Sequence, residues 1–298
     1  MYSYILYGMK ITSDIEFSQL VGCVDDRSPD VIVESGDIPQ WLADKEQAGI
    51  QYEFGDKISW LSNRTCYLYM EKGNRITYRL KEGGNPMYLR TYILGWGISM
   101  LALQRGIIAM HCSAVADEQG AVLISGRSGS GKSTLTAALL EEGYRLMADD
   151  MALVEETKER IMVSPAFPYQ KLCRDAALEQ GYRLEELQYI SEEKDKFLVP
   201  YRGEFSTEPV PVKGFIMLGI TGGDKVICEE AKGLQKFQII INNQFLQGLL
   251  GKDKYKPEIG QKCLSFASKI PVYYLLRPEG ADTTKEVRAK VFEILNIR

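Results

Sequence analysis

Residues 126–134 read GRSGSGKST, and the pair Asp149-Asp150 follows a short distance downstream. The first eight residues match G-x-x-x-x-G-K-[ST] at every fixed position, which is the pattern of a phosphate-binding P-loop. Glycines let the backbone curl so that N–H groups face phosphate oxygens, and the following helix adds its positive dipole end. The residues expected to line the phosphates are Gly126, Ser128, Gly129, Ser130, Gly131, Lys132, Ser133 and Thr134.

The context of this loop supports the motif. An apolar strand, 121–125, leads into it, and a helical pattern, 132–142, leaves it. We therefore expect ATP to bind, with Lys132 reaching the β- and γ-phosphates and the Ser133 hydroxyl on Mg²⁺.

The aspartate pair is expected to return to the phosphate end. The helix and the strand that follows, 144–148, each rise about 16 Å, so the chain goes out and comes back by the same length. One carboxylate is needed beside Mg²⁺, and a second can accept the proton of an attacking hydroxyl or water. Adjacent strand residues face opposite sides, so Asp149 and Asp150 would have different roles. The alternative to two catalytic roles is that one of the two aspartates is a metal ligand and the other is a solvated loop or cap residue.

His111 is the third candidate. A lone histidine in an apolar run is by default a hydrogen-bonded core residue, but here it could bond a neighbouring aspartate and tune its basicity. Downstream of the aspartates we find neither an hhhhDE segment nor an LSGGQ-like signature, which disfavours motor and transporter ATPases.

The chain divides at a turn-rich segment, 81–86, into a β-rich domain, 1–85, and a catalytic domain, 86–298. The predicted class is α/β with a mixed sheet. The first domain is expected to contain strands at 30–34 and 58–61, a hairpin at 66–70 and 75–80, and a short helix starting near Pro39. The second is expected to contain helices at 87–104, 132–142, 234–250 and 284–295, the last with a capping box at Thr283 and Glu286, strands at 107–115, 121–125 and 144–148, and hairpins at 151–155/160–164 and 212–221/225–230.

Composition narrows the functional classes. The net charge of −4 over 298 residues suggests neither a nucleic-acid groove nor a polybasic membrane patch. The longest uncharged run, 91–104, would rise about 21 Å as a helix, short of a bilayer core of roughly 30 Å. The start of the chain lacks signal-peptide features, and the six scattered cysteines show no metal-ligand spacing. We expect a cytoplasmic protein with reduced thiols and no nucleic-acid or membrane partner.

Three segments together resemble the kinase domain of HPr kinase/phosphorylase, which shares its core with phosphoenolpyruvate carboxykinase. They are His111-Cys-Ser-Ala-Val, GRSGSGKST, and the run from Gly143 to Val154. The resemblance covers residues about 87–220 well. It implies a mixed-sheet P-loop kinase core with Asp149 as the catalytic base, His111 as its helper, and Asp150 with Ser133 as the Mg²⁺ ligands.

The departures from this family bear on the acceptor. The EVRGLG-like signature of the bifunctional enzymes is replaced by a poor match at 201–205, so phosphorylase activity and HPr as substrate are not expected. Residues 4–9, 13–15 and 165–172 look more like stand-alone HPr-kinase-like proteins found beside lasso-peptide and other peptide-maturation genes. That resemblance implies a serine acceptor on a precursor peptide or small protein, with the amino-terminal domain as a possible recognition module.

Lys171 and Lys196 lie where this family folds over the phosphates and the substrate, and we expect both to contact them. Two other functions stay open. The acceptor could be a free amino acid or another metabolite, or the chain could be a nucleotide-binding regulator without an acceptor. A homo-oligomer is also possible.

Overall fold

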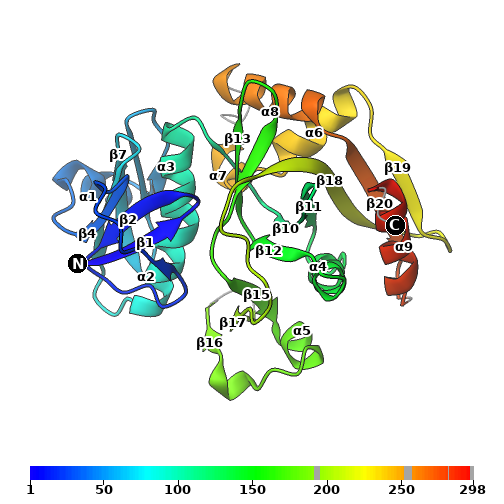
Figure 1. The fold of residues 1–298 in the computed structure, drawn as a ribbon. Coiled ribbons are helices and arrows are strands. Elements are labelled where there is room, and N and C mark those ends of the chain that lie inside the picture. The colour runs from blue at the N-terminus through cyan, green and yellow to red at the C-terminus, as the bar shows by residue number, and fades with distance from the viewer. Residues whose placement is uncertain (191–194, 252–256, 281, 296–298) are drawn as a thin grey trace.

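The computed structural model describes residues 1–190, 195–251, 257–280 and 282–295 (Figure 1). In this part of the chain an eight-stranded amino-terminal sheet lies beside a nine-stranded central sheet, and a small three-stranded sheet projects from the latter. Both large sheets contain parallel and antiparallel pairs, and helices pack on them. The chain therefore has the mixed α/β class that its sequence predicts.

The amino-terminal sheet is built from β1 (Tyr2–Leu6), β2 (Met9–Ser13), β3 (Val21–Gly22), β4 (Val31–Ser35), β5 (Tyr52–Glu53), β6 (Ile58–Ser62), β7 (Cys66–Glu71) and β8 (Arg75–Leu80), with helix α1 (Gln40–Gln47) between β4 and β5. The strand order is β3-β1-β2-β4-β8-β7-β6-β5. The predicted strands, the β7–β8 hairpin and the short helix all form. The β1–β2 hairpin was not predicted, because its two-residue turn is Tyr7-Gly8 rather than an Asn-Gly or Asp-Gly pair.

That turn fastens the two large sheets together. Tyr7 and Gly8 have φ values of 53° and 75°, as the two central residues of a type I′ turn require. The Tyr7 backbone N–H donates to Pro165 O at 2.9 Å, and its buried hydroxyl donates to Met151 O at 2.9 Å. Tyr7 therefore holds the amino-terminal sheet against the residue that follows Asp150.

The helix predicted at 87–104 is present, with a break in its hydrogen-bond pattern. It consists of α2 (Pro86–Tyr92), a π-helical turn (Ile93–Gly97) and α3 (Ile98–Gln104). The Gln104 side chain accepts a hydrogen bond from Gly73 N at 2.8 Å, and Arg105 donates to Gly73 O at 3.2 Å. The domain boundary at residues 85–86 stays a prediction, but this helical segment lies against the sheet that precedes it.

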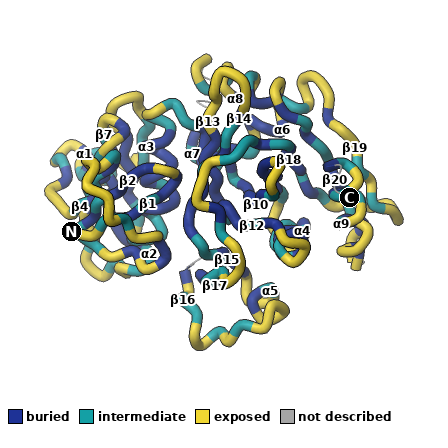
Figure 2. Tube along the Cα trace, viewed as in Figure 1, coloured by how far each residue is buried: buried dark blue, intermediate teal, exposed yellow. Residues whose placement is uncertain are grey.

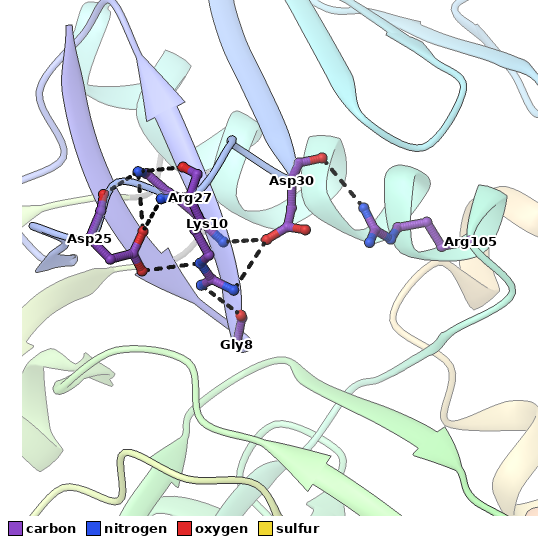
Figure 3. Close-up of polar contacts among 6 residues, drawn as sticks. All are labelled: Gly8, Lys10, Asp25, Arg27, Asp30 and Arg105. Carbon is purple, nitrogen blue, oxygen red and sulfur yellow. Dashed lines mark hydrogen bonds and ion pairs between the residues drawn. The ribbon is translucent and has the colours of Figure 1, made fainter.

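A buried lysine fastens the segment between β3 and β4 to strand β2 (Figure 3). Lys10 Nζ donates to Asp25 O at 2.5 Å and to Arg27 O at 2.7 Å, and lies 3.2 Å from Asp25 Oδ1. Asp30 accepts a hydrogen bond from Lys10 N at 2.8 Å, and Arg105 reaches Asp30 O at 3.5 Å. With these partners the Lys10 ammonium group is hydrogen-bonded despite its burial.

The central sheet contains β9 (Ile108–Met110), β10 (Ser113–Asp117), β11 (Gly120–Gly126), β12 (Arg145–Ala148), β13 (Ala152–Glu156), β14 (Ile161–Ser164), β18 (Val210–Thr221), β19 (Ile227–Glu230) and β20 (Val272–Pro278). Its main path is β12-β10-β11-β18-β14-β13-β9, and β20 pairs with both β18 and β19. β18 runs parallel to β11 and to β20. The hairpin predicted at 212–221/225–230 is wrong, because β20 lies between these strands and pairs with each.

Helices α4, α6, α8 and α9 lie beside the central sheet (Figure 1). Helix α4 (Lys132–Glu141) packs against α9 (Thr284–Ile294), and α6 (Leu234–Asn242) packs against α8 (Pro257–Lys269). The helix predicted at 234–250 divides into α6 and α7 (Gln247–Leu250), and α8 was not predicted. The capping box was wrong, since the Thr283 side chain makes no capping hydrogen bond. Among the described residues, no helix is long and apolar enough to cross a bilayer.

The small sheet contains β15 (Tyr169–Cys173), β16 (Gln188–Tyr189) and β17 (Lys196–Pro200), in the order β15-β17-β16. Helix α5 (Arg174–Glu179) and a 3₁₀ turn (Leu184–Glu186) accompany it. Leu172, Phe197 and Val199 point to one face and pack with Ala177 of α5 in a separate small core. The opposite face carries Lys171 and Lys196 together with the buried Leu198, which packs into the large core.

Strand β11 is buried along nearly its whole length (Figure 2), and its side chains alternate between two cores. Ala121 and Leu123 pack into the core that continues into the amino-terminal sheet, whereas Val122 and Ile124 pack under α4 and α9. A strand buried on both sides is a rigid base for the loop that leaves its end. The described cysteines are all free, and burial raises the pKa of Cys66, Cys112 and Cys263 to about 12, consistent with packing roles.

Candidate functional site

The glycine loop connects β11 to α4, as the sequence predicts. Gly129 and Gly131 have φ values of 81° and 101°, in the region that favours glycine. Ser130 N donates to Arg127 O at 3.0 Å and closes the turn. Ser128, Gly129 and Thr134 are exposed, whereas Lys132 and Ser133 in the first turn of α4 are half-buried. The loop therefore has a curled form, of the kind in which phosphate-binding turns occur.

Gly126 is required for a different reason, which is space. A Cβ atom at this position would lie 2.4 Å from Ser130 Oγ and 2.9 Å from Leu218 Cβ and O. The loop can fold back over the strand end only because residue 126 has no side chain. A phosphate cradle needs this close approach of backbone, so the residues present fit such a group.

Arg277, at the end of β20, donates hydrogen bonds to the loop, and the sequence did not predict this contact. Its Nε donates to Ser130 O at 3.0 Å, and its guanidinium NH2 group donates to Gly129 O at 2.7 Å. These bonds give two loop carbonyls a hydrogen-bond partner on β20. No local signal marks Arg277, because only the parallel pairing of β18 with β20 brings it there.

Asp149 and Asp150 follow β12, two strands from β11 along the sheet. Asp149 Oδ1 accepts a hydrogen bond from Ser113 Oγ at 2.6 Å, and its Oδ2 accepts one from Lys171 N at 2.7 Å. Asp150 has φ of 70°, a conformation that is uncommon for a residue with a side chain. The two carboxylates consequently meet different partners.

Asp150 is nearly buried among cations. Its Oδ2 lies 2.9 Å from Lys171 Nζ, and its Oδ1 lies 3.9 Å from Lys196 Nζ. Burial alone would raise the pKa of Asp150, but the charges of Lys171, Lys132 and Lys196 hold it well below its usual range. Asp150 is therefore a permanent carboxylate at neutral pH.

His111 lies at the break between β9 and β10, where the sequence predicts one continuous strand. The break occurs because β9 pairs with β13, whereas β10 pairs with β11 and β12. His111 Nδ1 lies 2.9 Å from Asp150 O and 3.7 Å from Asp150 Oδ1. A carbonyl only accepts, so Nδ1 carries the proton and Nε2 of the neutral ring is an acceptor.

Burial of His111 lowers its pKa, and this outweighs the opposing effect of Asp150. The ring is therefore mostly neutral at pH 7. The family resemblance implies that His111 assists Asp149, but the hydrogen bond in this structure is to the backbone of Asp150.

Asn243 and Ser125, which the sequence did not mark as site residues, form hydrogen bonds with the backbone of His111. His111 N donates to Asn243 O at 2.7 Å. The Ser125 hydroxyl lies 2.7 Å from both His111 O and Asn243 Oδ1 and donates to one at a time. Since Ser125 precedes Gly126, this network connects the histidine directly to the start of the P-loop.

Lys171 and Lys196 come from the small sheet. Lys171 pairs with Leu198 and Cys173 pairs with Lys196, so both lysines lie on the same face. Leu172, Phe197 and Val199 occupy the other face, whereas Leu198 shares the face of the lysines and packs into the large core. Arg174 forms an exposed ion pair with Asp195, 2.5 Å apart, so it is occupied away from this cluster.

A cavity of about 380 Å³ opens beside this cluster. It is lined by His111, Asp150, Lys171 and Lys196, together with Trp96 from the helical segment and Asn243. A narrow cavity of about 20 Å³, lined by Asp149 and Tyr7, shares Thr91, Lys171 and Ile190 with it. The wide cavity contains Asp150 and the narrow one contains Asp149. No group of three or more acidic, histidine or cysteine side chains suited to a metal ion occurs among the described residues.

No known protein family matches the sequence, and no curated protein matches it either. Among solved structures, the chain is similar to the HPr(Ser) kinase/phosphatase from Coxiella burnetii, with 12% sequence identity and a TM-score of 0.31. The match covers 63% of this chain and 93% of that chain. A similarity this distant does not support a functional conclusion, which therefore depends on the geometry of the site.

Proposed function

We propose that the protein transfers a phosphoryl group from ATP to a hydroxyl group, with a P-loop kinase core of the HPr kinase type. The observation that carries the proposal is the juxtaposition at one sheet edge of a glycine cradle and an ionised Asp150–Lys171 pair beside His111. A binding module needs the cradle alone. Ionised carboxylates and lysines around an adjoining cavity suit the charge changes of phosphoryl transfer.

The cradle and its neighbours would hold the donor. Backbone N–H groups of the loop from Gly126 to Gly131 would bind phosphate oxygens, and Lys132 would offset their charge. Mg²⁺, when bound, would neutralise charge on the transferred group. Ser133 and Asp150 would hold the metal, because both offer hard oxygen ligands and Asp150 stays ionised.

Asp149 is our candidate for the base. Its two oxygens are fixed by Ser113 and by the backbone of Lys171, so the carboxylate is oriented before an acceptor binds. A base must come within hydrogen-bond reach of the hydroxyl, and Asp149 lines the narrow cavity that shares Lys171 with the wide one. His111 would donate its Nδ1 hydrogen to the backbone carbonyl of Asp150. The neutral Nε2 of His111 would then be free to accept a proton or a hydrogen bond in the wide cavity.

For the acceptor we propose a serine hydroxyl of a peptide or small protein, with a lasso-type ribosomal precursor peptide as the class that the family resemblance favours. The cavity lies where the helical segment of Trp96 meets the central sheet, so a chain could extend along the amino-terminal domain. A second candidate is a free amino acid or similar metabolite. Its support is the volume of about 380 Å³, within the range of a small-molecule pocket.

The test uses labelled ATP with serine-ended peptides and with free serine as alternative acceptors. We expect Asp149→Asn to lower transfer by at least about 100-fold while ATP affinity changes less than about 3-fold. Asp224→Asn, in an exposed turn, is the matched control and should leave both unchanged. Weaker ATP binding with normal turnover would overturn the assignment of the base. Label that remains wholly in ATP with every acceptor would instead favour a nucleotide-binding regulator.

A further inference from the structure

A groove of about 690 Å³ opens at one edge of the amino-terminal sheet. Its lining comes from α1, from β5 and the turn after it, from β6 and from α7, and none of its lining residues belongs to the candidate site. The large apolar residues in the lining are Trp41, Tyr52, Phe54, Ile58, Trp60 and Leu249. We refer to this feature as the aromatic groove.

The apolar surface of the aromatic groove faces solvent. Trp41 is 39% exposed and Ile58 is 44% exposed, although both side chains are large. The rings of Tyr52 and Phe54 lie 5.6 Å apart between centroids, and both residues are half-buried. Apolar side chains that gather at one exposed place typically mark an interaction site.

The two charged residues in the lining are paired with each other. Lys45 Nζ lies 2.5 Å from Glu53 Oε2, which also accepts a hydrogen bond from Trp60 Nε1 at 2.9 Å. Lys45 Nζ in addition lies 5.4 Å from the centre of the Trp41 ring. With its charges compensated in this way, the groove suits uncharged apolar side chains rather than an ionic ligand.

The groove runs along a sheet edge that has room for a further strand. β5 is the last strand in the order of this sheet, and among the described residues it pairs with β6 alone. Ser62 N donates to Gln51 O at 2.7 Å, so the alternation of an antiparallel ladder turns the N–H and C=O groups of Tyr52 away from β6. Such an edge binds extended peptides through their backbone.

Helix α7 connects this groove with the proposed acceptor site. Leu249 lines the aromatic groove, whereas Gln247 and Gly248 line the wide cavity that contains His111 and Asp150. The helix lies between the amino-terminal sheet and the central sheet (Figure 1). A peptide that passes over α7 would therefore contact both features.

We infer that the aromatic groove holds an extended segment of the peptide substrate whose acceptor serine lies in the wide cavity. The inference rests on the proposed function and deepens it, because it assigns a recognition segment that is separate from the acceptor. Large apolar side chains at alternate positions of this segment would point into the groove, since strand residues alternate between faces. A helix is about 10 Å wide and an extended chain advances about 3.3 Å per residue, so at least about three residues would separate the segment from the serine.

The first experiment measures peptide binding without nucleotide. Two fluorescent peptide libraries end in serine after a spacer of about four residues, and they differ only at alternate positions of the preceding segment. One library carries Trp, Phe, Tyr, Leu or Ile there, and the other carries Ser, Thr, Asn or Gln. By fluorescence anisotropy we expect the apolar library to bind at least about 10-fold more tightly.

Ile58→Lys places a charge in the groove and should weaken binding of the apolar library about 10-fold. Val21→Lys is the matched control, because Val21 is 41% exposed and lies in β3 at the opposite edge of the same sheet. It should change binding less than about 2-fold. Trp41→Ala, which adds no charge, should weaken binding about 3- to 10-fold.

The second experiment measures transfer from labelled ATP to the same peptides. Ile58→Lys should raise KM for the apolar peptides about 10-fold, leave kcat within about 2-fold, and leave KM for free serine unchanged, because only remote binding is lost. For the unmodified chain, shortening the spacer to one residue should raise KM about 10-fold, since serine and segment can no longer bind together.

Equal affinity for the two libraries, or equal affinity of Ile58→Lys and the unmodified chain for the apolar one, would overturn the inference. Transfer to free serine would in that case leave the proposed function intact. A dimer of the unmodified chain that Ile58→Lys abolishes, measured by sedimentation without peptide, would assign the groove to a second copy and also overturn it. Peptide binding that depends on Ile58, with no transfer to any acceptor, would support the groove and contradict the proposed function.

Discussion

The Lys171 ammonium group lies 2.9 Å from Asp150 Oδ2, and the two side chains are only 18% and 12% exposed. Removing one partner of a buried ion pair leaves a charge without compensation. Lys196 stays within 3.9 Å of Asp150, so part of the compensation would remain. We predict that Lys171→Met lowers the free energy of unfolding by about 1–3 kcal/mol, measured by urea denaturation at pH 7.

The control for this prediction is the double variant Lys171→Met with Asp150→Asn. Since the carboxylate is then neutral, the double variant should be less destabilised than the sum of the two single variants. Additive effects would show that the two side chains are not coupled.

The same surroundings predict how stability depends on acid. The pKa of Asp150 in the folded state is held well below its usual range, whereas in the unfolded chain it is about 3.9. The unfolded state therefore takes up a proton first, and the stabilisation from this group is lost as pH falls below about 4 toward the folded pKa. Below pH 4, unfolding free energy should fall more steeply for the unmodified chain than for Asp150→Asn. Equal slopes in denaturation series from pH 5 to pH 2 would contradict this.

Local signals in the sequence are sufficient for the first half of the candidate site. The fixed glycines of the loop and the matched lengths of α4 and β12 predict a cradle with Asp149 and Asp150 near its edge. These signals do not predict in which direction the aspartate side chains point. The left-handed backbone of Asp150 turns its carboxylate toward the small sheet, and that conformation is not evident in a run of ordinary residues.

Long-range pairing accounts for most of what the sequence did not predict. The turn residues after β18 favour a hairpin with β19, but β20 pairs with both strands and takes the position between them. That insertion also brings Arg277 to the glycine loop. Asn243 reaches His111 only because the helix predicted at 234–250 ends early, at Asn242. Such pairings depend on the tertiary core rather than on local propensity.

His111 is predicted to make stability sensitive to pH near neutrality. Burial lowers its pKa in the folded state below the unfolded value of about 6.5. The unfolded state binds a proton first, so stability rises with pH through this range and is lost as pH falls below about 6.5. We expect His111→Asn to flatten the pH dependence of the thermal midpoint between pH 5 and pH 8. An unchanged profile would show that this histidine is not the titrating group, since the described chain contains no other histidine.

Metal dependence follows from the proposed roles of Ser133 and Asp150. Chelation of divalent cations with EDTA should abolish transfer, and added Mg²⁺ should restore it. With Asp150→Asn the Mg²⁺ concentration for half-maximal rate should rise about 10-fold, because an ionised oxygen ligand is lost. Ser133→Ala should act in the same direction and more weakly. Unaltered Mg²⁺ dependence in both variants, with Asp224→Asn as control, would remove these residues from the metal site.

Gly126 provides a direct test of the cradle itself. In Gly126→Ala the new Cβ would lie 2.4 Å from Ser130 Oγ and 2.9 Å from Leu218, so the loop or the strand beneath it must shift. Overpacking of this kind typically costs about 1–3 kcal/mol, and displaced N–H groups would bind phosphate poorly. We predict a loss of unfolding free energy in that range and at least about 10-fold weaker ATP binding. Gly222→Ala is the matched control, because it has no atom within 4 Å of the added Cβ and no left-handed φ. Retention of full ATP affinity by Gly126→Ala would show that the close approach of backbone at this strand end is not part of the nucleotide site.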